Sequence, residues 1–237
     1  MAPCAVDNGS ARMRVLHHHW QLLAILAVVF MLWSTPVILP LKLLVVFFHE
    51  LSHGLAAILT GGSIETISVS FQQGGEAWTR GGSRFAILTA GYLGSLLIGV
   101  GLLWAALRST ADRAVLGGLG ALMLVVLVLY VRDLPAALIC LGTGAALLAG
   151  ARYLPRQGCD LALRVIGLSS LLYVPYDIFD DTLRRSALRS DARMLAEEVG
   201  GTTVMWGALW LIISLAVISF AARRILGRDS NLYFGKG

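Results

Sequence analysis

The chain has 237 residues and a formal net charge of +5 at pH 7, with 57% hydrophobic and only 14% charged residues. A soluble globular domain carries about 25% charged residues, so this composition excludes a water-facing fold of the same size. Lys and Arg lie mostly between apolar runs, where such residues anchor helix ends and meet anionic headgroups. We therefore expect a multi-pass integral membrane protein whose partner is the lipid bilayer and which binds no nucleic acid.

Seven apolar segments come close to the length of about 20 residues that a helix needs to cross the hydrocarbon core. They lie at about 20–38, 41–60, 84–107, 114–131, 134–151, 161–179 and 203–222. The predicted fold class is an all-α polytopic bundle of about six to eight transmembrane helices, with seven preferred. Lys and Arg divide evenly between the two sides of a seven-span arrangement, so the positive-inside rule assigns no orientation.

The chain shows no internal repeat, so we expect a single membrane-embedded domain over residues 20–227. A polar tail without an evident cleavable signal peptide precedes it at 1–19, and a second tail follows at 228–237. The final "NLYFGKG" resembles the remnant of a protease-cleavable purification tag. Three cysteines with no CxxC spacing support neither a disulfide framework nor a cysteine metal site.

Two segments are too polar to cross a membrane. Residues 64–80, "IETISVSFQQGGEAWTR", alternate in polarity around a "QQGG" turn and predict a small β-hairpin. The alternation places Ile64 on one face of the first strand and Ile67 and Val69 on the other. Residues 180–200 carry charges of alternating sign, which favours a helix at the membrane interface or an extension of the sixth span.

The second apolar segment contains His49-Glu50-Leu51-Ser52-His53, an HExxH pattern. On a helix, residues four apart share a face, so both imidazoles can bind one metal ion while Glu50 lies near the ion's open position. The donors suit a single catalytic zinc, which lowers the pKa of its bound water towards ~7, with Glu50 accepting the proton. A five-residue pattern also occurs by chance, but ionisable groups inside a span are costly and usually mark function.

A catalytic zinc site needs a third protein ligand, and the remaining histidines, 17 to 19, all precede the first span. The acids nearest a span lie in "YVPYDIFDD", where Pro175 interrupts the backbone hydrogen bonds of the helix. We predict Asp177 as the third ligand, with Asp181 or Asp180 as a supporting partner or an alternative ligand. The competing interpretation is an acidic helix end paired with Arg184 and Arg185.

Together these features resemble the site-2 protease class of zinc intramembrane metalloproteases, and most closely its M50B-like subgroup. The similar blocks cover most of residues 41–222 and are "HELSHGLAAILTGG", "AGYLGS", "YDIFDDTLRRSALRSDARMLAE" and "WGALW". The resemblance implies hydrolysis of peptide bonds within or beside a transmembrane substrate helix. It makes His49 and His53 ligands and Glu50 the general base, and it puts Asp177 in place of the family's later aspartate.

The chain departs from the site-2 protease pattern at two blocks. No glycine follows Asp177, and "GYLGS" replaces the family's Gly-Pro-x-x-Asn block, so Ser95 is the one candidate substitute for its asparagine. Independently of the family, Gly91, Ser95 and Gly99 are spaced by four and predict close approach of another helix. The predicted hairpin would hold an extended substrate by strand addition, which makes Ile67 and Val69 candidate substrate-positioning residues.

Two other functions are compatible with the same metal site. A catalytically inactive metal-binding scaffold has no need of Glu50 as a base. A metal-ion transporter usually shows paired repeats with broken helices, and no second HExxH-like segment exists here. An active zinc endopeptidase is the preferred hypothesis.

Overall fold

The computed structural model of the chain describes residues 8–185, 189–226 and 229–231. Within them lie eight α-helices and one β-hairpin, in the order α1 (Asn8–Met31), α2 (Leu39–Leu59), β1 (Ser63–Val69), β2 (Gly75–Arg80), α3 (Arg84–Arg108), α4 (Asp112–Tyr130), α5 (Leu134–Tyr153), α6 (Arg156–Phe179), α7 (Asp191–Val199) and α8 (Thr203–Leu226). The outer parts of both predicted tails, 1–7 and 232–237, lie outside the described residues.

Six helices of the described chain are long and apolar enough to cross a membrane, namely α2 with its preceding turn, α3, α4, α5, α6 with its C-terminal extension, and α8. The protein is therefore a multi-pass integral membrane protein, and the predicted all-α bundle with a small β-hairpin is confirmed.

The segment predicted as the first of seven spans is different. Its apolar helical part, His17–Met31, is shorter than a crossing. The helix ends because Thr35, which precedes Pro36, takes an extended conformation with φ −97° and ψ 156°. The ring of a proline disfavours helical geometry in the preceding residue, so the chain turns before α2 begins.

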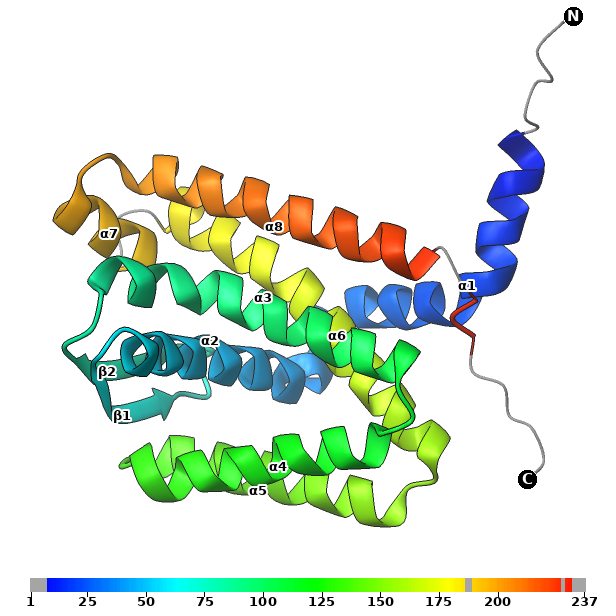
Figure 1. Cartoon of the computed structure of the whole chain (residues 1–237), viewed down its shortest axis with the longest axis horizontal. Coiled ribbons are helices and arrows are strands. Elements are labelled where there is room, and N and C mark those ends of the chain that lie inside the picture. The colour runs from blue at the N-terminus through cyan, green and yellow to red at the C-terminus, as the bar shows by residue number, and fades with distance from the viewer. Residues whose placement is uncertain (1–7, 186–188, 227–228, 232–237) are drawn as a thin grey trace, which may run out of the picture.

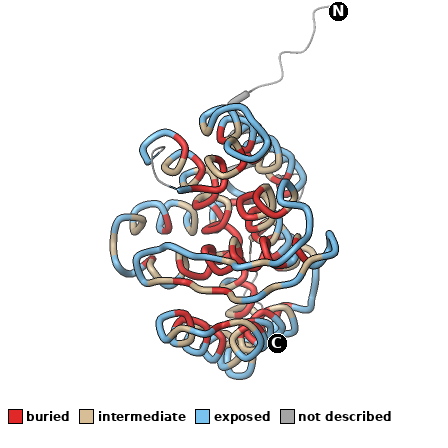
Figure 2. Tube along the Cα trace, turned by 90° about the vertical axis from the view of Figure 1, so that its left-hand side faces the viewer, coloured by how far each residue is buried: buried red, intermediate tan, exposed pale blue. Residues whose placement is uncertain are grey.

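Helix α2 is the centre of the bundle. It packs against α3, α6 and both strands, and 67% of its apolar window is buried, against 22% for α5 and α8. Figure 1 shows the hairpin at one end of α2 and the α4–α5 pair along one side, with α8 on the opposite side. In the end-on view of Figure 2 the buried residues gather on the inward faces of the helices, so the outer helices present apolar side chains to lipid.

Helices α3 and α6 cross closely because small residues face one another. A Cβ added at Gly167 would lie 2.8 Å from the carbonyl oxygen of Gly99, and one added at Gly99 would lie 3.0 Å from Oγ of Ser170. Small residues at such a crossing let two membrane helices pack backbone to backbone. The close approach predicted from the Gly91–Ser95–Gly99 spacing is thus confirmed at Gly99.

The hairpin lies against the C-terminal half of α2. Gly54 has no Cβ, and one built there would lie 2.6 Å from Cδ1 of Ile64 and 3.7 Å from Cδ1 of Ile67. Both isoleucines therefore face α2, whereas simple alternation placed them on opposite faces. The register of the ladder shifts between Ile64 and Thr66, so the extra residue, Glu65, rotates Ile64 onto the buried face.

The charged segment 180–200 divides into two parts. Residues Asp180–Arg184 continue α6 as one π-helical turn, which is the predicted extension of the sixth span. Helix α7 is a separate helix that begins at Asp191. The Ser190 side chain before it accepts a hydrogen bond from the Arg193 N–H. An N-cap of this kind starts a helix because it satisfies an otherwise unpaired amide.

We expect Gly167→Ala to destabilise the protein by about 1–3 kcal/mol, because its methyl group meets the backbone of α3, which has no room to yield. Gly142→Ala on α5 is the matched control, since no atom lies within 4 Å of the added Cβ. Thermal unfolding of both variants in detergent micelles measures the difference. Equal melting temperatures would contradict the close α3–α6 crossing.

Candidate metal centre

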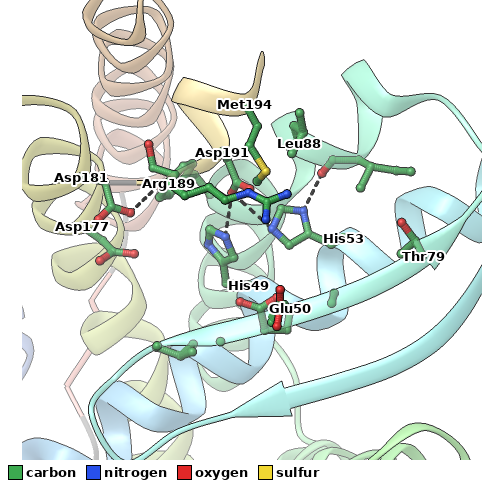
Figure 3. A pocket seen from close by; sticks show the side chains of 18 of the residues that line it. His49, Glu50, His53, Thr79, Leu88, Asp177, Asp181, Arg189, Asp191 and Met194 are labelled. Carbon is green, nitrogen blue, oxygen red and sulfur yellow. Dashed lines mark hydrogen bonds and ion pairs between the residues drawn. The ribbon is translucent and has the colours of Figure 1, made fainter. Parts of the chain in front are cut away.

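The HExxH residues lie together on the buried face of α2. Ligand atoms of His49, Glu50 and His53 are all within 4.8 Å of one another, and the two imidazole centroids are 4.7 Å apart. Glu50 and His53 are only 5% and 6% exposed. All three line a cavity of about 450 Å³ that is bordered by β2, α3, the end of α6 and the start of α7 (Figure 3).

One imidazole has a fixed tautomer. Nδ1 of His53 lies 2.7 Å from the carbonyl oxygen of Ile87 on α3. A carbonyl oxygen only accepts hydrogen bonds, so Nδ1 carries the proton and the neutral ring presents the lone pair of Nε2 to the cavity. Outer partners of this kind set the tautomer and orientation of metal-binding histidines.

A carboxylate from outside the motif meets both imidazoles. Oδ2 of Asp191 lies 2.9 Å from Nε2 of His49 and 3.2 Å from Nε2 of His53. A carboxylate oxygen and an unprotonated Nε2 are both electron-rich, so their approach requires a positive charge, either a proton on the ring or a metal cation. Two imidazole nitrogens and one carboxylate oxygen are a donor set that zinc binds.

Helix α7, which carries Asp191, is attached to α3 by an ion pair. Arg84 at the start of α3 forms an ion pair with Glu198 of α7, with Nε 2.9 Å from Oε1. Asp191 itself is 7% exposed. Burial alone would raise the pKa of its carboxyl group, but the imidazoles of His53 and His49, in their protonated form, hold that pKa below its usual range.

Helix α3 covers the other side of the imidazoles. A Cβ added at Gly91 would lie 2.6 Å from Cε1 of His53. The Tyr92 ring packs edge-on against His49 with centroids 4.7 Å apart, and its hydroxyl donates a 2.6 Å hydrogen bond to Oδ2 of Asp181. Tyr92 thus connects the face of α2 that carries the two histidines to the end of α6.

The three predicted carboxylates of α6 occupy different positions. Asp177 and Asp181 line the same cavity as the histidines (Figure 3), and the side chain of Asp177 makes no hydrogen bond or ion pair with another described residue. Asp181 also accepts a 2.8 Å hydrogen bond from Arg185, whose pKa is raised by Asp181 and Asp180 although burial opposes that change. Asp180 is not among the cavity residues and pairs with Arg185 and Arg184, at 2.7 and 3.9 Å.

The predicted substrate-positioning residues lie away from the cavity. Ile67 and Val69 are fully buried in the hydrophobic core, so their side chains are not available to a substrate. The strand that borders the cavity is β2, through residues 75–79, together with residues 73 and 74 of the preceding turn. Ser95 is 1% exposed and donates its hydroxyl hydrogen bond within its own helix, to the carbonyl oxygens of Gly91 at 2.8 Å and Tyr92 at 3.0 Å.

Asp191 and Tyr92 are residues of the centre that the sequence predictions did not include. Treating 180–200 as one polar helix hid the boundary at Ser190. The pattern Ser190-Asp191, a capping serine followed by an acid in the first turn, is a helix-start signal that would have separated Asp191 from the preceding charges. Tyr92 has no comparable local signal, because its contacts with His49 and Asp181 are both long-range.

Comparison with known proteins agrees with the geometry of the centre. The profile of the family described as Peptidase M50B-like matches residues 22–221, which include every residue of the centre. No curated protein and no solved structure matches the chain.

We expect Gly91→Ala to weaken zinc binding by about 10–100-fold, the range seen when groups that orient metal-binding histidines are changed. The added methyl group must displace both imidazoles. Competition with a fluorescent zinc chelator measures the affinity in detergent. Gly101→Ala on the same helix is the control, because no atom lies within 4 Å of its Cβ; unchanged affinity in both variants would contradict the contact.

Proposed function

The chain belongs to the Peptidase M50B-like family, and from this premise we propose that it is a zinc-dependent intramembrane endopeptidase. In this proposal it hydrolyses peptide bonds in or next to transmembrane segments of membrane-protein substrates. The observation that carries the proposal is the convergence of two imidazole nitrogens and one carboxylate oxygen beside a further buried acid, Glu50, in one cavity.

His49, His53 and Asp191 are the residues that would hold one zinc ion. Zinc bound there supplies Lewis-acid polarisation of the scissile carbonyl group and a lowered pKa for water. We propose Asp191 rather than Asp177 as the third ligand, because its Oδ2 already lies close to both Nε2 atoms. Asp177 is the alternative third ligand, and the zinc content of the two aspartate variants decides between them.

Glu50 is the proposed general base. Its carboxylate takes a proton from the attacking water and returns that proton to the amine nitrogen as the carbon–nitrogen bond breaks. The backbone of β2 passes directly over this side chain, because a Cβ added at Gly75 would lie 2.6 Å from Cγ of Glu50. A strand that close to the base brings an adjacent substrate strand close to it as well.

Strand β2 is the proposed binding site for the substrate backbone. Consecutive residues 73–79 border the cavity, and among the described strands β2 pairs with β1 alone, which leaves its other edge unpaired. A helical substrate keeps its carbonyl groups in its own hydrogen bonds, whereas an extended one exposes them. Addition of the substrate as a third strand would therefore present a peptide bond to Glu50 and the metal ligands.

Glu50→Gln tests the proposed activity. We expect zinc content to stay at the wild-type level while cleavage falls by about 100- to 10,000-fold, because the amide cannot accept the proton of water. The measurements are metal analysis and cleavage of a quenched fluorescent peptide with a transmembrane segment, in proteoliposomes. Retained cleavage in the variant would remove Glu50 from its role, and zinc binding without cleavage by the wild-type chain would favour a metal-binding scaffold.

Asp191→Ala and Asp177→Ala together test the ligand set. We expect zinc to fall well below the wild-type content of about one ion per chain in Asp191→Ala, because a three-ligand site loses its only carboxylate. Asp177→Ala should keep its zinc. Mass spectrometry of the metal in purified protein decides between them, and the opposite pattern would assign the third ligand to Asp177.

A further inference from the structure

Hydrolysis of a peptide bond places negative charge on the carbonyl oxygen, and hydrogen-bond donors aimed at that oxygen often give the largest single contribution to catalysis. Several donors near the histidines are already engaged. The Tyr92 hydroxyl donates to Asp181, and the Ser95 hydroxyl donates within its own helix. Beside the polarisation that zinc would supply, another side chain that borders the cavity can provide a donor for the developing charge.

Three arginines border the cavity, and two of them have carboxylate partners. Arg84 pairs with Glu198 at 2.9 Å, and Arg185 pairs with Asp180 and Asp181 at 2.7 and 2.8 Å. The third, Arg189, makes no hydrogen bond or ion pair with another described residue. Its five N–H donors are therefore available to a bound molecule.

The side chain of Arg189 points towards the proposed metal ligands. Figure 3 shows its side chain extending across the cavity towards His53 and Asp191. Its backbone lies two residues before Asp191, and between them Ser190 caps α7. The segment that carries the guanidinium group is thus anchored to the helix that supplies the proposed metal ligand.

We propose that Arg189 is a catalytic residue that donates a hydrogen bond to the carbonyl oxygen of the scissile peptide bond as that oxygen becomes negative. This inference rests on the proposed function. The water oxygen bonds to the carbonyl carbon, Glu50 moves the water proton to the leaving nitrogen, and the carbon–nitrogen bond breaks. Arg189 neither gains nor loses a proton, because a guanidinium group stays charged in proteins.

The test compares Arg189→Met, Arg189→Lys and Arg193→Met with the wild-type chain in detergent, using a quenched fluorescent peptide whose transmembrane segment is about 20 residues long. Arg193→Met is the matched control, because this exposed arginine of α7 pairs with Glu197 and does not border the cavity. We expect Arg189→Met to lower kcat by about 100-fold with KM and zinc content unchanged. Arg189→Lys, which keeps the charge, should lose less, and Arg193→Met should match the wild type.

A second measurement does not depend on turnover. A phosphinic peptide carries a tetrahedral, negatively charged centre like the one that forms in the reaction, whereas acetohydroxamate binds a metal without it. Arg189→Met should bind the phosphinic peptide about 100-fold more weakly than the wild type, and acetohydroxamate equally well.

These results separate the inference from the proposal on which it rests. Wild-type kcat and wild-type phosphinic affinity in Arg189→Met would overturn the role of Arg189 while leaving the peptidase intact. A higher KM with unchanged kcat would overturn it too, since it would assign Arg189 to substrate binding alone. A wild-type chain that binds neither zinc nor the phosphinic peptide would overturn the proposed function itself.

Discussion

Two imidazole nitrogens of α2 and one carboxylate oxygen of α7 can share a cation only if these two separate segments of backbone approach one another within the length of their side chains. The structure meets this constraint with α2 at the centre of the bundle, α3 on one side and α7 on the other. Glycines allow the close contacts within this arrangement, because a side chain would not fit there. Gly91 lies against the imidazoles, Gly75 lies against Glu50, and Gly167 lies against α3. The rest of the bundle keeps these contacts from separating.

The same arrangement gives four ionisable groups of the centre a partner within a membrane protein. A buried charge or polar atom in an apolar environment is costly unless it has a partner. His53 has the Ile87 carbonyl group and Asp191, His49 has Asp191, and Asp181 has Tyr92 and Arg185. The cavity beside them is lined by these polar side chains, so it offers polar space next to the imidazoles.

Local sequence patterns predicted much of this structure, because the interactions behind them are local. Six apolar spans, the hairpin and the pairing of His49 with His53 on one helix face each follow from spacings of a few residues. What the sequence did not reveal depends on packing or on one-residue irregularities. The shift at Glu65 turned Ile64 inward, Thr35 and Pro36 shortened the first apolar segment, and the chain folded back to bring Asp191 rather than Asp177 against both histidines.

Asp191 lies 142 residues after His49, on a helix that follows all but the last of the six spans. Because Asp191 lies on α7, its carboxylate cannot meet the two imidazoles until most of the chain has been synthesised and folded back on α2. A chain that is still emerging from the ribosome would therefore carry its HExxH helix in the membrane without a competent site. Late completion of this kind would keep the proposed protease inactive towards other nascent membrane proteins until its own fold is finished.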